Sequence, residues 1–194
     1  MWLIAGLGNP GPEYEGTRHN FGFMALEVLS RRLKIPIRDF DRRLRLGRGQ
    51  RRGENIILAR PLGFMNLSGE ILAPLARREG VDISRILVMV DDLDLPLGTL
   101  RYRPKGGSAG HRGMESVLHC LGSDGFGRIR LGIGRPEEPL SEIDYVLSPF
   151  RENETPIVEK VIAKAADLAM EVIFNGRTTP VTINLTENQE KEGL

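Results

Sequence analysis

The chain has 194 residues, of which 40% are apolar and 27% charged, and it contains one cysteine. This composition is typical of a globular domain and excludes a largely disordered chain, and a single cysteine excludes an internal disulfide framework or a multi-cysteine zinc module. No apolar run reaches the roughly 18 residues that a membrane span needs, so we expect a soluble, cytoplasmic protein.

Strand and helix patterns alternate along the chain. Short apolar runs closed by turn residues predict strands, and apolar residues at helical spacing predict helices. In chain order we expect strand 2–7, helix 20–33, strand 55–59, helix 67–78, strand 85–90, helix 111–121, strand 129–133 and helix 155–175. This alternation predicts a single three-layer α/β domain over residues 1–185, in which helices flank a mixed, mostly parallel central sheet. Residues 186–194 are expected to form a polar C-terminal tail.

The net charge of +1 is a cancellation between unlike parts of the chain. Residues 31–52 include ten basic and two acidic residues, whereas residues 137–194 include twelve acidic and five basic ones. A second basic stretch, residues 101–112, has no acid. Such asymmetry is typical of proteins with an anionic partner, although a solvated arginine-rich hairpin would explain residues 31–52 equally well.

Polar side chains follow several of the predicted strands. Asn9 comes after the first strand, Asn66 after the strand 55–59, and Asp91 directly after the strand 85–90. In α/β sheets, functional groups collect beyond the carboxyl ends of the strands. The sequence therefore predicts a functional site at that edge of the sheet.

The segment Gly6-Leu7-Gly8-Asn9-Pro10-Gly11 has the glycine spacing of a dinucleotide-binding turn. That turn needs a helix to begin within the glycines, so that its N-terminus faces the pyrophosphate. Pro10, Gly11 and Pro12 prevent a regular helix there. We therefore interpret the segment as a rigid turn that holds Asn9, and a nicotinamide-dependent oxidoreductase is the least favoured alternative.

The titratable residues near these strands allow two interpretations. Asp91-Asp92-Leu93-Asp94 offers hard oxygen ligands for Mg²⁺, but no phosphate-binding loop accompanies it, so we predict no metal. His19 lies where a loop meets a helix, and Asp91 is the natural carboxylate to orient it. A His–Asp pair without a serine or cysteine nucleophile would activate water.

Two further segments carry groups suited to substrate. Phe64-Met65-Asn66 combines an aromatic ring, a thioether and an amide, and Asn66 would either cap a helix or donate to a developing oxyanion. The glycine-rich stretch 106–113 enters a helix and presents backbone N–H groups that favour phosphate. A flexible lid and a plain connection are the other interpretations of that stretch.

Taken together, these motifs closely resemble the bacterial peptidyl-tRNA hydrolase family. The resemblance rests on Gly6–Gly11, Tyr14–Gly22, Phe64–Gly69, Asp91–Pro96, Gly107–Gly113 and Arg130–Gly134, which occur in the order of the family. It covers residues 3 to about 150. It implies an α/β enzyme that cleaves the ester between a peptide and the 3′ end of tRNA, without a metal or cofactor.

The resemblance also implies a role for each matching residue. His19 matches the general base, Asp91 the carboxylate that orients it, and Asn66 and Asn9 the residues that place water and the substrate carbonyl. The residues expected to contact the peptide or the tRNA are Tyr14, Phe64, Met65, Asn66, Arg101, Arg103, Lys105, Gly110, His111, Arg112 and Arg130. The basic residues among them are expected to hold the acceptor stem and the 5′ phosphate of the tRNA.

The sequence departs from the family at Arg112, where an asparagine is usual, so the role of that position differs here. A non-hydrolytic RNA-binding protein on the same fold is the main alternative function. The intact set of His19, Asp91, Asn9 and Asn66 favours the enzyme, because RNA binding alone would not require it. We expect a monomer that does not bind membranes.

Overall fold

The computed structural model describes residues 1–136 and 140–186, so the predicted tail lies, except for Thr186, outside the described residues. Eight strands form one sheet in the order β2-β3-β4-β1-β5-β7-β6-β8. Their bounds are β1 Trp2–Gly6, β2 Arg38–Asp41, β3 Leu44–Arg51, β4 Glu54–Pro61, β5 Ile86–Asp92, β6 Thr99–Arg103, β7 Gly127–Gly132 and β8 Val181–Asn184. The helices are α1 Phe21–Leu33, α2 Ser68–Arg78, α3 Arg112–Leu121, α4 Glu142–Val146 and α5 Thr155–Asn175.

The sheet is mixed, as predicted, but its parallel part is confined to the centre. Strands β4, β1, β5 and β7 are parallel neighbours, whereas the pairings of β2–β3, β3–β4, β6–β7 and β6–β8 are antiparallel. Among the described strands, three pairings are parallel and four are antiparallel, so the expectation of a mostly parallel sheet holds only for the central strands. The antiparallel outer strands were not among those predicted, and they account for the difference.

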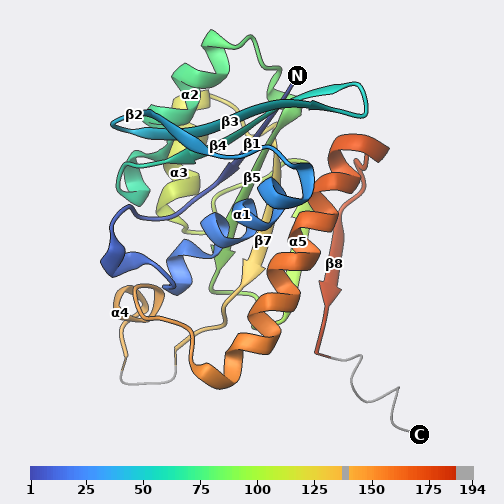
Figure 1. Cartoon of the computed structure of the whole chain (residues 1–194). Coiled ribbons are helices and arrows are strands. Elements are labelled where there is room, and N and C mark those ends of the chain that lie inside the picture. Colours follow the sequence, from blue (N-terminus) through green and yellow to red (C-terminus); the bar gives the residue numbers. More distant parts are fainter. Residues whose placement is uncertain (137–139, 187–194) are drawn as a thin grey trace, which may run out of the picture.

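Helices cover both faces of the sheet, which confirms the predicted three-layer α/β arrangement (Figure 1). Helices α1 and α5 pack on one face, where Ile4, Leu58 and Leu87 of the strands join their core. Helices α2 and α3 pack on the other face over Leu3, Ala5 and other alternate residues of the same strands. Successive side chains of a strand point to opposite faces, so each central strand contributes to both cores.

The four predicted helices are present, and their ends lie within one residue of the prediction. Pro156 stands in the first turn of α5, and Gly176 follows the helix in the left-handed conformation at φ 63°. Proline suits the first turn because its missing N–H would have no partner there, and glycine adopts positive φ without steric cost. Among the described residues, no helix is long and apolar enough to span a membrane.

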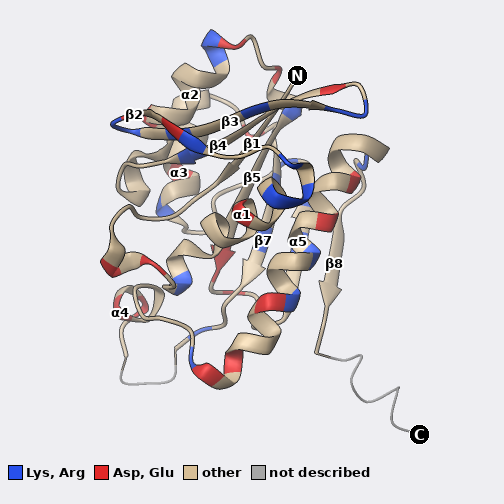
Figure 2. Ribbon diagram, in the orientation of Figure 1, with Lys and Arg blue, Asp and Glu red and all other residues tan. Residues whose placement is uncertain are grey.

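Much of the arginine-rich segment forms the hairpin of β2 and β3, and acids pair with part of its positive charge. Leu44 and Leu46 of β3 are buried, whereas Arg45 and Arg48 alternate with the buried positions. Acids contact three of its arginines, in the pairs Arg43–Glu70, Arg45–Asp39 and Arg48–Glu79. Figure 2 shows these basic strands with acidic segments beside them. The sequence count therefore overstates the free positive charge of this surface.

Close packing of two glycines brings the start of α1 against the central strands. A Cβ atom at Gly22 would lie 2.3 Å from the carbonyl oxygen of Met89, and one at Gly6 would lie 2.3 Å from the carbonyl oxygen of Gly22. Only glycine permits such an approach of backbone to backbone. The turn before α1, which carries His19, is thereby held at the carboxyl end of β5, where Asp91 lies.

Candidate active site

A cavity of about 550 Å³ lies at the carboxyl ends of β1 and β5 and beside β7. It contains most of the residues that the sequence predicts for the site. These are Asn9, His19, Phe64, Met65, Asn66, Asp91, Gly110, His111, Arg112 and Arg130. The sheet edge predicted from the sequence is therefore where the side chains meet.

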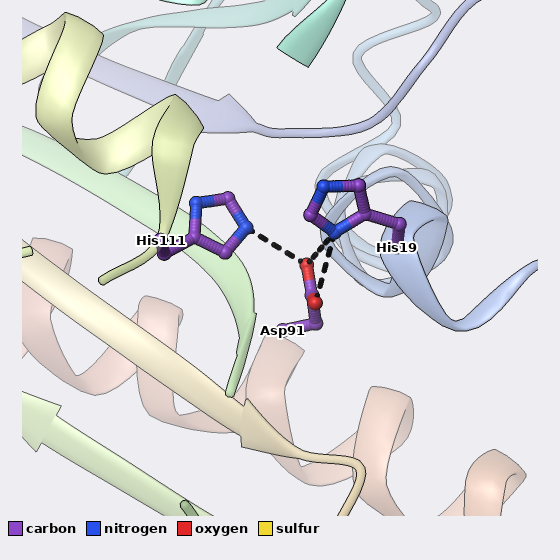
Figure 3. A group of neighbouring side chains, drawn as sticks. All are labelled: His19, Asp91 and His111. Atoms are coloured by element: carbon purple, nitrogen blue, oxygen red, sulfur yellow. Dashed lines mark hydrogen bonds and ion pairs between the residues drawn. The ribbon is translucent and has the colours of Figure 1, made fainter. Parts of the chain in front are cut away.

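Asp91 lines this cavity, and its carboxylate lies between two imidazoles (Figure 3). Nδ1 of His19 is 3.0 Å from each carboxylate oxygen, and Nε2 of His111 is 3.0 Å from Oδ1. Asp91 is only 2% exposed. A buried carboxylate is costly unless hydrogen-bond donors satisfy it, and the two histidines supply those donors.

The hydrogen bonds fix the tautomer of His111 and indicate that of His19. Nδ1 of His111 accepts from the backbone N–H groups of Gly113 and Met114, at 3.1 and 3.2 Å, and so caps α3. Its proton must therefore be on Nε2, which donates to Asp91. The short contact of His19 Nδ1 with the carboxylate likewise assigns a proton to Nδ1. Nε2 of His19 is then left with a lone pair.

The charge of Asp91 is set by these two neighbours. Burial would raise the pKa of the Asp91 carboxyl, but the interactions with His19 and His111 outweigh burial and lower that pKa well below its ordinary range. Asp91 is therefore an anion at neutral pH. An anion beside His19 favours a positive charge on that imidazole when it takes up a proton.

A second network joins the turn after β1 to the segment after β4. Oδ1 of Asn9 accepts from the N–H of Met65 at 2.8 Å, and the N–H of Asn9 donates to Oδ1 of Asn20 at 2.7 Å. Nδ2 of Asn20 returns a hydrogen bond to the carbonyl of Asn9. This network leaves the Nδ2 donor of Asn9 for the cavity and fixes the segment that presents Asn66, which is exposed.

The carboxylates after β5 do not converge on one point. Asp92 accepts from Nη1 of Arg130 at 3.1 Å, and Asp94 pairs with Arg135. The ligand atoms of His19, Asp91 and His111 lie within 4.8 Å of one another, which is close enough for a cation. Two N–H···O hydrogen bonds already account for that closeness. The three aspartates of the segment 91–94 therefore do not form the Mg²⁺ site considered from the sequence.

Two buried arginines of β7 hold the glycine-rich stretch in place. Arg128, fully buried, donates to the carbonyls of Gly106 and Asp124. Arg130 donates to the carbonyl of Gly107 at 2.7 Å while it pairs with Asp92. These arginines anchor the stretch, and His111 near its end is thereby positioned beside Asp91.

Four predicted contact residues lie outside the cavity lining. Tyr14 is in a short 3-10 turn after the glycines, and no long helix begins there, which argues against a dinucleotide site. Arg101 and Arg103 stand on β6 directly opposite Arg130 and Arg128 of β7. The four arginines therefore form a band on one face of the sheet. Lys105 follows them and lines a different cavity.

The sequence prediction missed the wall of the cavity that α4 provides. Ile143, Val146 and Leu147 line it, and Arg135 ties α4 to the β5 end through Glu142 and Asp94. Ser141 caps α4 by accepting from the N–H of Asp144. The Ser-x-x-Asp pattern at 141–144 is typical of a helix start and could have indicated α4. A helix of five residues, however, is too short to show a helical period of apolar residues.

Fold and site together define an α/β protein whose cleft holds a histidine oriented by a buried carboxylate. No serine or cysteine lines the cleft among the described residues, so the site suits activation of water. The sequence model of the family "Peptidyl-tRNA hydrolase" matches residues 3–192. The chain belongs to the peptidyl-tRNA hydrolase family, and the predicted family and hydrolase function are confirmed.

Individual relatives agree with this assignment. The peptidyl-tRNA hydrolase of Bacillus cereus (strain ATCC 14579) is 47% identical over 88% of this chain and 92% of its own length. That of Thermoanaerobacter sp. (strain X514) is 43% identical over 91% of this chain and 95% of its own. The crystal structure of the Acinetobacter baumannii enzyme is 32% identical, with a TM-score of 0.84 over 91% of this chain and 89% of that one.

Proposed function

We propose that His19 is the general base in the hydrolysis of the ester between peptide and tRNA. Nε2 of His19 takes a proton from water, and the hydroxide oxygen forms a bond to the ester carbonyl carbon. The resulting tetrahedral oxyanion then expels the 3′ oxygen of the tRNA, which takes the proton from His19. The observation that carries this proposal is the pair of hydrogen bonds from His19 Nδ1 to the buried Asp91 carboxylate.

Asp91 orients His19 and stabilises its charged form. The carboxylate remains negative at neutral pH and holds Nδ1, so Nε2 is kept as the acceptor for the water proton. His111 holds the same carboxylate from the other side. Because Nδ1 of His111 accepts from the backbone of α3, that nitrogen is not available to take the proton from water. We therefore assign His111 a positioning role rather than only the substrate contact that the sequence suggested.

The two asparagines supply donors for the reacting carbonyl. Asn66 is exposed to the cavity and its amide aligns the water or binds the oxyanion. Asn9 offers Nδ2, since its Oδ1 is bound to Met65. Phe64, which is 60% exposed, and Met65 provide apolar contact for the peptide or the terminal nucleotide.

The tRNA approaches from the side of the glycine-rich stretch. Arg101 and Arg103 are the half-buried members of the band on β6 and β7, and they bind phosphates of the acceptor stem and the 5′ end. Lys105 follows the end of β6, while Gly110 and Arg112 line the active-site cavity. Tyr14 contacts the 3′ end from the turn after β1.

We also propose the setting in which the enzyme works. Residues 1–185 act as one catalytic domain, the protein functions as a monomer in the cytoplasm where peptidyl-tRNA arises, and the reaction uses no metal or cofactor. The recycled product is free tRNA from aborted translation.

Release of labelled peptide from an N-acyl-aminoacyl-tRNA tests this function directly. We expect release with purified protein at neutral pH, and the same rate after treatment with a chelator. Tight tRNA binding without release would identify a non-hydrolytic RNA-binding protein and would contradict the proposal.

A further inference from the structure

A second cavity lies at the edge of the sheet opposite the active site. We call it the rear cavity, and it encloses about 440 Å³. Its wall is formed at the amino ends of β1, β5 and β7, the end of β6 and the end of α5, by Trp2, Ser84, Arg85, Ile86, Tyr102, Pro104, Lys105, Gly125, Gly127, Val172, Gly176, Arg177 and Thr178. In Figure 1 this is the upper edge, near the N-terminus.

All the charged side chains that line the rear cavity are cations. Arg85 pairs with Glu54 through Nη1, and Arg177 pairs with Glu171 through Nε, so each guanidinium keeps further N–H donors. Lys105 is exposed, and neither glutamate lines the cavity. The lining therefore offers donors and positive charge, which suit a phosphate group.

The remaining lining provides aromatic surface and hydrogen-bond acceptors. The ring of Trp2 has the Arg85 guanidinium 5.5 Å from its centre, and its buried Nε1 has no acceptor among the described residues. Tyr102 is 3% exposed and donates its hydroxyl hydrogen to the carbonyl of Arg177, so it stays neutral and fixes the end of α5. The last carbonyls of α5, before Gly176, accept hydrogen bonds.

We propose that the rear cavity binds a nucleoside phosphate, with the phosphate on Lys105, Arg177 and Arg85 and the base against the ring of Trp2. Its volume falls within the range of small-ligand sites, about 300–1,000 Å³.

The nucleoside phosphate could come from two sources, a free mononucleotide or a nucleotide within bound tRNA. Strand β6 carries Arg101 and Arg103, and Lys105 comes two residues after its end, so RNA that lies along this strand would reach the rear cavity. This site is separate from the catalytic cleft, and its test does not depend on hydrolysis.

Fluorescence of Trp2 provides the test, because Trp2 is the only tryptophan of the chain and lines the cavity. The intact protein is titrated with AMP, adenosine and inorganic phosphate at low salt. We expect a saturable change with AMP and much weaker binding of adenosine and phosphate. Absence of a saturable change with both AMP and uncharged tRNA, or equal affinity for AMP and phosphate, would overturn the proposal.

Three variants locate the binding. Lys105→Gln and Arg177→Gln should each weaken AMP binding about tenfold, as expected for the loss of one charge-assisted hydrogen bond. Arg38→Gln removes an exposed charge on β2, the outermost strand on the side of the sheet away from β6 and β8, and should leave the affinity unchanged. Equal affinity in all three variants would contradict the site.

Competition with uncharged tRNA distinguishes the sources. If saturating tRNA displaces AMP, the natural ligand is a nucleotide of the bound RNA. If AMP and tRNA bind together, the ligand is a free mononucleotide. Either result supports a nucleoside-phosphate site and assigns its source.

Discussion

Nε2 of His111 lies 3.0 Å from Oδ1 of Asp91, while Nδ1 of the same ring caps α3. The imidazole thus joins the backbone of a helix to the carboxylate that orients His19. One side chain serves stability and catalysis together, so its removal has consequences that can be measured separately.

His111→Ala should lower kcat about tenfold or more, because Asp91 loses its second N–H donor and no longer holds His19 in one orientation. The free energy of unfolding should fall by about 1–2 kcal/mol through loss of the α3 cap. Steady-state kinetics and urea unfolding measure the two effects. If KM for peptidyl-tRNA rises while kcat is unchanged, His111 is a substrate contact and the positioning role is wrong.

The lowered pKa of Asp91 predicts an acid dependence of stability. A carboxyl whose pKa is lower in the folded state stabilises the fold above its unfolded pKa, about 3.9, and this stabilisation is lost as the pH falls below that value. Between pH 4 and pH 3, unfolding free energy should fall by about 1 kcal/mol more in the parent than in Asp91→Asn. Parallel acid dependences in the two proteins would show that Asp91 is not selectively stabilised as an anion.

Gly22→Ala tests the contact that places the His19 turn. A Cβ atom there would clash with the Met89 carbonyl, so we expect a loss of about 1–3 kcal/mol of stability and a lower kcat. Gly107→Ala is the matched control, because a Cβ at Gly107 meets no atom within 4 Å. Thermal unfolding and peptide release should separate the two variants, and equal stability would refute the role of close packing.

Phosphate contacts predict a steep dependence of tRNA binding on salt. Arg101→Gln and Arg103→Gln should each weaken binding and reduce the slope of log affinity against log salt by about 1. Arg42→Gln, in the turn between β2 and β3, should have little effect. A slope that changes only in Arg42→Gln would place the RNA on the arginine-rich hairpin instead of the band.

The sequence predicted the pair His19–Asp91 because Asp91 directly follows a predicted strand, where functional groups collect in α/β sheets, and His19 lies where a loop meets a helix. The role of His111 required backbone geometry, since nothing in its sequence context shows which ring nitrogen caps α3. The α4 wall was missed for a different reason, because Ile143 and Leu147 are exposed and the helix that carries Ile143 has only five residues.

Charge was the least reliable guide to the surface. The sequence left open whether the cluster at residues 31–52 binds an anionic partner or forms a solvated hairpin, and Glu70 and Glu79 pair with two of its arginines from distant positions in the sequence. The band of Arg101, Arg103, Arg128 and Arg130 depends instead on the pairing of β6 with β7, which was not predicted because β6 was not recognised as a strand.

Turnover by His19→Ala tests the central claim most directly. Peptide release from N-acyl-aminoacyl-tRNA and tRNA affinity are measured side by side for the parent and the variant. We expect kcat to fall by about 10²–10⁴, the usual contribution of a general base, with tRNA affinity nearly unchanged. Release at a rate comparable to the parent would contradict the assignment of His19 as the base.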